Sequence, residues 1–243
     1  MIRAVLFDLD DTLYAQEAWL AGAWEAVAGA AASHGVPGPA LASALAGIAA
    51  EGSDRGRIID RALERVGWPG VPVEPLVEAF RSHAPARLPT YPGVPAALAA
   101  LRTRASIGLV TDGEPAVQRA KLAALALGDA FDVVVLSDEL GRRYRKPHPA
   151  PFRAALAALG VDPSAALFVG DRPDKDVAGA AAAGMACIRV LTGEYAGVPD
   201  TVAPLLRVAD VGAAIDWIGR PGLTSLLGGS PERPANRSLR ERR

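Results

Sequence analysis

The sequence predicts an α/β fold with a Rossmann-like parallel sheet, helices on both of its faces, and an inserted α-helical cap domain. Short apolar runs rich in β-branched residues alternate with alanine- and leucine-rich segments of helical length, which is typical of such sheets. Residues 14–89 contain helical patterns only. We therefore expect a Rossmann-like core made of residues 1–13 and 90–219, interrupted by a cap over residues 14–89.

Five apolar runs have the length and composition of buried parallel strands. They are Ile2–Phe7, Ile107–Val110, Val133–Leu136, Leu167–Val169 and Ala186–Val190. The single cysteine, Cys187, lies in the last run and has no partner for an internal disulfide. We expect it to be a buried core thiol.

Helical segments follow the strands, and several of them begin with proline, which suits the first turn of a helix. In the core we expect helices at Pro95–Arg102, Pro115–Ala126, Pro149–Leu159 and Asp174–Ala183. Glycine and proline turns separate the segments of the cap. Its expected helices are Gln16–Ala32, Pro39–Ala50, Ser53–Val66 and Glu74–His83.

Composition and charge exclude several classes of partner. The net charge is −1, and no cluster of basic and aromatic residues outside the C-terminal segment indicates binding to nucleic acid or a membrane. Residues 220–243 are rich in glycine, proline, serine and arginine, so we expect a disordered basic tail. No signal-peptide pattern or membrane-spanning apolar run is visible, which favours the cytoplasm. The sequence does not indicate an oligomeric state.

Two carboxylates, Asp8 and Asp10, directly follow the first strand. The carboxyl ends of parallel strands form the ligand crevice of open α/β sheets. Two acids a few ångströms apart repel by roughly 4 kcal/mol at an effective dielectric of about 20, so the pair predicts a cation. A hard divalent ion such as Mg²⁺ fits best. The alternative is an acidic turn that caps the next helix through Asp10, Asp11 or Thr12.

Thr111 ends the second strand and is followed by Asp112 and Gly113. A hydroxyl and two exposed backbone amides just before a helix could bind a phosphate-sized anion. An ordinary turn is the other interpretation of this segment.

Lys146 lies in a basic loop after the third strand. Lysine is rare in this chain, which contains only Lys121, Lys146 and Lys175. A compact positive charge would neutralise both a carboxylate and a transferring phosphoryl group. For the neighbouring Arg142, Arg143 and Arg145 we prefer a solvated basic loop.

The fourth strand ends at Gly170, which permits close backbone approach, and is followed by Asp171. Asp171 would complete the metal site. Asp174 is expected to cap the next helix, and Asp176 could orient Lys146 from behind.

Together these segments resemble the haloacid dehalogenase-like hydrolase superfamily, in its phosphatase-like branch with a type 1 helical cap. The resemblance runs from residue 2 to about residue 219. Four motifs match in order and spacing: Asp8-Leu9-Asp10-Asp11-Thr12, Thr111, Lys146-Pro147, and Gly170-Asp171 through Asp176. Two positions depart from the usual pattern, since many relatives have asparagine where this chain has Asp112 and Lys175.

The resemblance implies a role for each motif residue. It makes Asp8 the nucleophile and Asp10 the general acid and base. It implies that Thr111 and Lys146 bind the phosphate, and that the magnesium ligands are Asp8, the Asp10 carbonyl and Asp171. These residue types suit the roles, because a carboxylate can form an aspartyl-phosphate and a nearby acid can protonate the leaving oxygen.

We therefore expect a magnesium-dependent phosphatase that hydrolyses a small-molecule phosphate monoester through an aspartyl-phosphate on Asp8. A sugar phosphomutase or other phosphotransferase of the same superfamily remains the nearest alternative. A phosphoryl-accepting or non-catalytic regulatory protein is an alternative of a different class. Asp10 disfavours dehalogenation, which protonates no leaving oxygen. Phosphonate hydrolysis is disfavoured because the cap contains no lysine.

The cap should determine which phosphorylated metabolite binds, and the sequence does not identify it. Tyr14 and Trp19 lie close behind the first motif and could contact the leaving group. Packing inside the cap is the other interpretation of Trp19. Leu20, Trp24 and Val27 have the spacing of a buried helix face.

Overall fold

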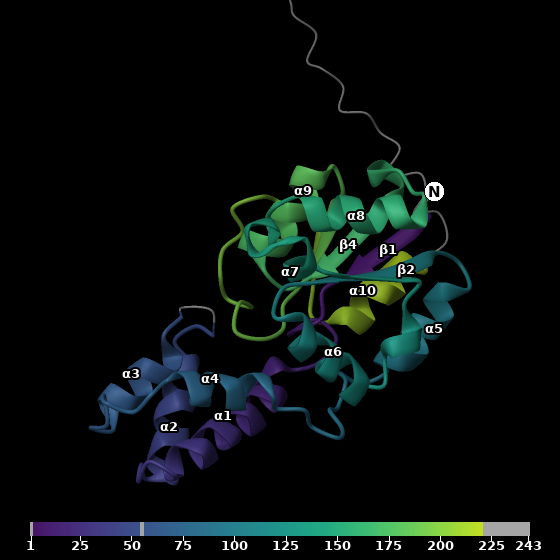
Figure 1. The fold of residues 1–243 in the computed structure, drawn as a ribbon. Coiled ribbons are helices and arrows are strands. Elements are labelled where there is room, and N and C mark those ends of the chain that lie inside the picture. Colours follow the sequence, from purple (N-terminus) through teal and green to yellow (C-terminus); the bar gives the residue numbers. More distant parts are fainter. Residues whose placement is uncertain (1, 54–55, 221–243) are drawn as a thin grey trace, which may run out of the picture.

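The computed structural model describes residues 2–53 and 56–220. It has two parts, a sheet covered by helices and a smaller group of helices at one end (Figure 1). Most of the expected basic tail, residues 221–243, lies outside the described residues. Across the described ranges, no helix is long and apolar enough to cross a membrane.

The sheet formed by the described residues has six parallel strands in the order β3-β2-β1-β4-β5-β6. The five expected strands are present. Strand β6 was not expected, because a three-residue edge strand shows too little apolar pattern to be recognised. The strands are β1 (Ala4–Phe7), β2 (Ser106–Thr111), β3 (Val133–Leu136), β4 (Ala166–Gly170), β5 (Ala186–Val190) and β6 (Leu206–Val208).

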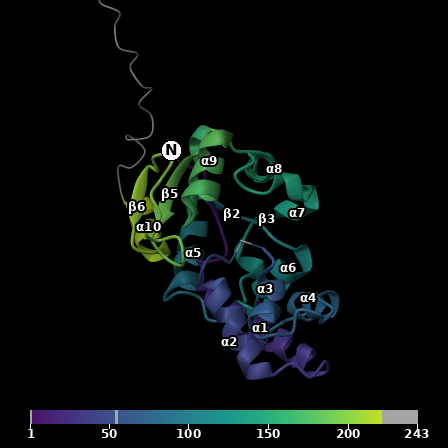
Figure 2. The same ribbon diagram turned by 90° about the vertical axis from the view of Figure 1, so that its left-hand side faces the viewer.

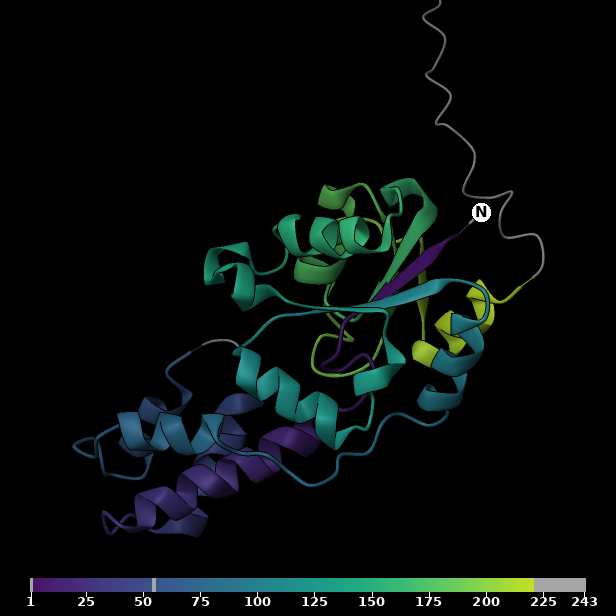
Figure 3. The same ribbon diagram turned by 45° about the vertical axis from the view of Figure 1, so that its right-hand side comes forward.

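Helices cover both faces of the sheet, which confirms the Rossmann-like fold (Figures 1 and 3). Val5 and Phe7 of β1 pack on one face, whereas Ala4 and Leu6 pack on the other. The first face is covered by α5 (Val94–Arg102), α6 (Pro115–Ala124) and α10 (Val211–Ile218), and the second by α8 (Ala150–Leu159) and α9 (Ala178–Ala183). The central strand is thus buried on both sides.

Short helical segments lie in the connections before and after β3 and β4. They are η1 (Gly128–Ala130), α7 (Ser137–Leu140), η2 (Arg142–Tyr144), η3 (Pro163–Ala165) and the π-helical turn η4 (Pro173–Val177). The expected helix 174–183 is therefore a π turn followed by α9. Asp174 does not cap it, because its carboxylate binds the Arg172 guanidinium instead.

The cap has its own hydrophobic core, and all three views place it at one end of the molecule beside α6 (Figures 1, 2 and 3). Its described helices are α1 (Gln16–Ala32), α2 (Gly38–Ala49), α3 (Ile58–Arg65) and α4 (Glu74–Arg81). Helix α3 begins later than expected because Gly56 (φ 71°) and Arg57 (φ 52°) are left-handed. An α-helix cannot continue through such residues.

The chain leaves the sheet after β1 and returns to it near residue 88. Hydrogen bonds tie the returning segment to the core, from the Leu88 amide to the Ala124 carbonyl (2.8 Å) and from the Tyr91 amide to the Leu13 carbonyl (2.9 Å). The division into core and cap at residues 14 and 89 stays a prediction.

Candidate active site

A cavity of about 490 Å³ lies at the carboxyl edge of β1, β2 and β4. Charged side chains from the loops after these strands line it on the core side. On the cap side the lining is mixed: apolar side chains, among them Trp19, Leu20, Trp24, Val77 and Phe80, lie together with the charged residues Arg57, Asp60 and Arg81. The cavity therefore combines a charged floor with a wall of mixed character.

Asp8 continues the sheet one residue beyond β1, since its amide donates to the Val169 carbonyl at 2.9 Å. Its carboxylate is buried and lies 2.5 Å from the Nζ atom of Lys146. Burial raises the pKa of Asp8 to about 7, although Lys146 opposes the shift. A carboxylate in this position is available as a nucleophile when a positive charge compensates it.

Lys146 is buried between two acids. Its Nζ atom lies 2.5 Å from Asp8 and 2.7 Å from Asp176. Burial alone would lower the pKa of Lys146, but Asp176 and Asp8 raise it above its usual value. Lys146 is therefore a permanent positive charge, and the contact with Asp176 is the one expected from the sequence.

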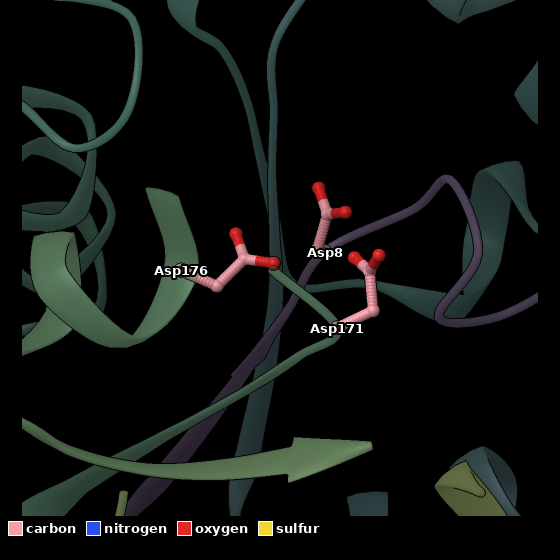
Figure 4. A group of neighbouring side chains, drawn as sticks. All are labelled: Asp8, Asp171 and Asp176. Carbon is pink, nitrogen blue, oxygen red and sulfur yellow. The ribbon is translucent and has the colours of Figure 1, made fainter. Parts of the chain in front are cut away.

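Asp8, Asp171 and Asp176 bring carboxylate oxygens within 4.8 Å of one another (Figure 4). The Oδ1 atom of Asp171 is buried and has no hydrogen-bond partner among the described residues. Burial and the neighbouring acids raise the pKa of Asp171 well above its usual value. An oxygen-only cluster with an orphaned buried carboxylate oxygen fits a hard divalent cation. Asp176 thus joins the expected metal site as a further candidate ligand.

A glycine is required where β4 ends. A Cβ atom at Gly170 would lie 2.4 Å from an Oδ atom of Asp176. The close approach expected at Gly170 is therefore present, and it allows the Asp176 side chain to reach Lys146.

The Asp10 carboxylate is not part of the three-residue acid cluster and binds three other side chains. The Tyr14 hydroxyl donates to Oδ1 at 2.5 Å, and Gln118 donates to Oδ2 at 3.1 Å. Lys121 contacts both oxygens, at 2.7 and 3.0 Å. Burial would raise the pKa of Asp10, but Lys121 and these hydrogen bonds lower it below its usual value. The carboxylate is thus ionised and fixed.

Sequence reasoning missed Gln118 and Lys121. Both are buried polar residues of α6, three positions apart, and therefore on one face of the helix. The scarcity of lysine, which singled out Lys146, applies equally to Lys121. That signal could have found it.

The segment after β2 lines the cavity with Thr111, Asp112 and Gly113. The Thr111 hydroxyl accepts a hydrogen bond from Gln118 at 2.6 Å. One oxygen of Asp112 accepts from the Ser137 hydroxyl (2.6 Å) and from the Lys146 amide (3.1 Å). The carboxylate that departs from the family pattern thus anchors the Lys146 loop. Phosphate binding by this segment stays a prediction.

Tyr14 and Trp19, the expected leaving-group contacts, occupy different positions. Tyr14 is fully buried behind Asp10 and uses its hydroxyl there, which does not favour substrate contact. Trp19 lines the cavity but is only 1% exposed, and its ring packs edge-on against Phe80 with centroids 5.0 Å apart. Its role in selectivity stays a prediction.

The loop after β5 braces the site and was not expected from the sequence. The buried guanidinium of Arg189 donates to the carbonyl of Asp171 at 3.0 Å and to that of Tyr195 at 2.6 Å. Glu194, which precedes Tyr195 in the same loop, accepts hydrogen bonds from the amide (3.1 Å) and hydroxyl (2.7 Å) of Ser53 in the cap. Arg189 of β5 therefore links the loop that follows this strand to the Asp171 carbonyl, and the same loop contacts the cap.

The sequence of the chain is similar to those of several phosphatases. The chain is 39% identical over 204 residues to a glyceraldehyde 3-phosphate phosphatase of Methanopyrus kandleri, covering 80% of this chain and 86% of the relative. It is 35% identical over 233 residues to a phosphoglycolate phosphatase of Rhodospirillum rubrum, covering 91% and 92%.

Among solved structures, a 2-haloacid dehalogenase from Pseudomonas syringae pv. Tomato DC3000 superimposes with a TM-score of 0.63. It is 28% identical, and the match covers 90% of this chain and 98% of that one. Residues 2–184 match the family model of the haloacid dehalogenase-like hydrolases. The family expected from the four motifs is thus confirmed, and the chain belongs to the haloacid dehalogenase-like hydrolases.

Proposed function

We propose that the protein is a magnesium-dependent phosphatase that hydrolyses a small-molecule phosphate monoester through an aspartyl-phosphate on Asp8. The observation that carries the proposal is that two neighbouring carboxylates, Asp8 and Asp10, have different partners. Asp8 pairs with Lys146 and lies beside Asp171, whose buried Oδ1 atom finds no hydrogen-bond partner in the part of the chain that the structure describes. Asp10, two residues along the chain, is fixed by other side chains. The names of several curated relatives support it, since these are phosphatases or a nucleotidase that act on small phosphate compounds.

In the first step, an Asp8 carboxylate oxygen attacks phosphorus and the bond from phosphorus to the leaving oxygen breaks. Asp10 delivers a proton to that oxygen; because Asp10 is ionised in the free protein, a monoanionic phosphate ester supplies this proton. Thr111 and the amides of Asp112 and Gly113 bind the phosphoryl oxygens. Lys146 offsets their charge.

In the second step, water attacks phosphorus and loses a proton to Asp10, and the bond to Asp8 breaks to restore the carboxylate. Mg²⁺ held by Asp8, Asp171 and the Asp10 carbonyl, with Asp176 nearby, would offset charge on the transferring group. The Asp10 carboxylate is the form needed as the base of this step.

A substrate panel tests the proposal. Purified protein with magnesium should release inorganic phosphate from aryl phosphates and from some sugar, nucleotide or small-acid phosphates. Chelation should abolish the release, and added magnesium should restore it. Halide release from 2-haloacids without phosphate release would contradict the proposal, and intramolecular phosphoryl transfer without release would indicate a phosphomutase.

Asp10→Asn should slow alkyl phosphates by about 10² to 10⁴, the usual contribution of proton transfer. Aryl phosphates with acidic phenols should be affected much less, because their leaving oxygen needs no proton. Steady-state kcat across a series of leaving groups measures the difference. Equal losses for all leaving groups would show that Asp10 is not the leaving-group acid.

A further inference from the structure

Lys121 is a buried cation that the proposed chemistry leaves without a task. It projects from α6, is 3% exposed, and lies at the cavity wall. Its Nζ atom lies 2.7 Å from one Asp10 oxygen and 3.0 Å from the other. Tyr14 and Gln118 each bind a single oxygen of the same carboxylate. Among the described residues, Lys121 alone binds both Asp10 oxygens.

The surroundings of Lys121 direct it to Asp10 and not to a substrate. The ammonium group of Lys121 donates hydrogen bonds to both Asp10 oxygens. The aromatic ring of Trp19 packs against the same group, with its centroid 4.6 Å from Nζ. A cation over an aromatic face is held there by the ring quadrupole. The ammonium group is therefore occupied on these sides, so an effect on the reaction must pass through Asp10.

We propose that Lys121 is a positioning residue that holds the Asp10 carboxylate in the orientation from which it exchanges a proton with the leaving-group oxygen. This role rests on the proposed phosphatase function. Gln118 continues the arrangement, because its amide joins Asp10 to Thr111 at the phosphate end of the cavity. Trp19 continues it toward the cap, since it belongs to α1. Asp10, Thr111 and Trp19 of α1 are thus all contacted by residues on one face of α6.

Without Lys121, Asp10 would be a buried carboxylate with neutral partners only, which is costly. Without the two contacts from the ammonium group, the carboxylate would turn away from its present orientation, which removes it from the position in which it exchanges a proton. The loss should therefore depend on how strongly the leaving group needs a proton.

The experiment compares Lys121→Met with Arg119→Met, an exposed residue of the same helix that pairs with Glu139 instead. Lys121→Met should slow an alkyl phosphate by about 10²-fold or more, within the range of lost proton transfer, and slow an activated aryl phosphate far less. Lys121→Arg should recover part of the loss. Arg119→Met should behave as the wild type. Uniform slowing of all substrates with a lower melting temperature would show a purely structural role and overturn the proposal.

A double-mutant cycle with Asp10→Asn tests whether the effect passes through Asp10. In the Asp10→Asn background, Lys121→Met should cause no further loss on the alkyl phosphate. The double variant lacks both the Asp10 and the Lys121 charge, so neither is left buried without its partner. It can therefore be compared with Asp10→Asn even if Lys121→Met alone does not fold. A full further loss would overturn the positioning role while the proposed function stands. A wild-type protein inactive toward every phosphate ester would overturn both.

Discussion

Asp8→Asn should lower kcat for every phosphate ester by about 10³-fold or more, as the loss of a catalytic nucleophile does in other covalent enzymes. Asp8 is the carboxylate that pairs with Lys146 at the end of β1, and an amide cannot form the aspartyl-phosphate. Steady-state rates of the wild type and the variant with one aryl and one alkyl phosphate measure the loss.

Two controls make this result specific. Asp8→Ala excludes slow conversion of the asparagine back to aspartate, and Asp11→Asn changes a buried neighbouring acid outside the three-residue acid cluster. Borohydride reduction of the acid-quenched wild-type enzyme should convert an acyl phosphate at position 8 to homoserine, which peptide mass spectrometry would locate. Undiminished turnover by Asp8→Asn, or a label elsewhere, would contradict the assigned nucleophile.

Lys146→Met should affect both stability and activity. It removes the positive charge between Asp8 and Asp176 and leaves buried carboxylates unpaired, which typically costs about 3 to 5 kcal/mol. Loss of a charge that stabilises the transferring group should lower kcat by about 10² to 10³. Denaturant unfolding without divalent ions, together with steady-state rates in magnesium, measures the two effects.

Magnesium distinguishes this explanation from simple misfolding. With Lys146 absent, the acid cluster carries one more uncompensated negative charge, so magnesium should raise the melting temperature of Lys146→Met more than that of the wild type. Arg143→Met, an exposed residue of the same loop, should show the wild-type shift. A magnesium shift no larger than that of the wild type would argue against a cation site beside Lys146.

The sequence was sufficient for the parts of the fold that depend on local pattern. Strands β1 to β5 are apolar runs with β-branched residues, and their helices show helical spacing. Strand β6 was not recognised, because it depends on the pairing of Leu206 with Ile188, which lies on a distant part of the chain. The helix expected at 174–183 is present, but its first turn is the π turn η4.

The same distinction applies to the site. Asp8, Thr111 and Asp171 could be placed together because parallel strands end at one edge. The partners of Asp10 could not, since they depend on which face of α6 turns toward β1. The contact between Tyr14 and Asp10 could not be predicted either, because it accompanies a left-handed backbone at Asp11 (φ 55°) that the residue pattern does not reveal.

The loop after β5 limits how freely the cap can be exchanged. Glu194 binds Ser53 of the cap, while Arg189 joins the same loop to the Asp171 carbonyl. Gly193 sits so close to Asp11 that a Cβ atom there would be 2.1 Å from the carboxyl carbon. A chimaera that receives a relative's cap therefore needs a matching partner for Glu194, or the graft must include this loop. For protein engineering, residues 192–195 belong with the cap even though they are encoded with the core.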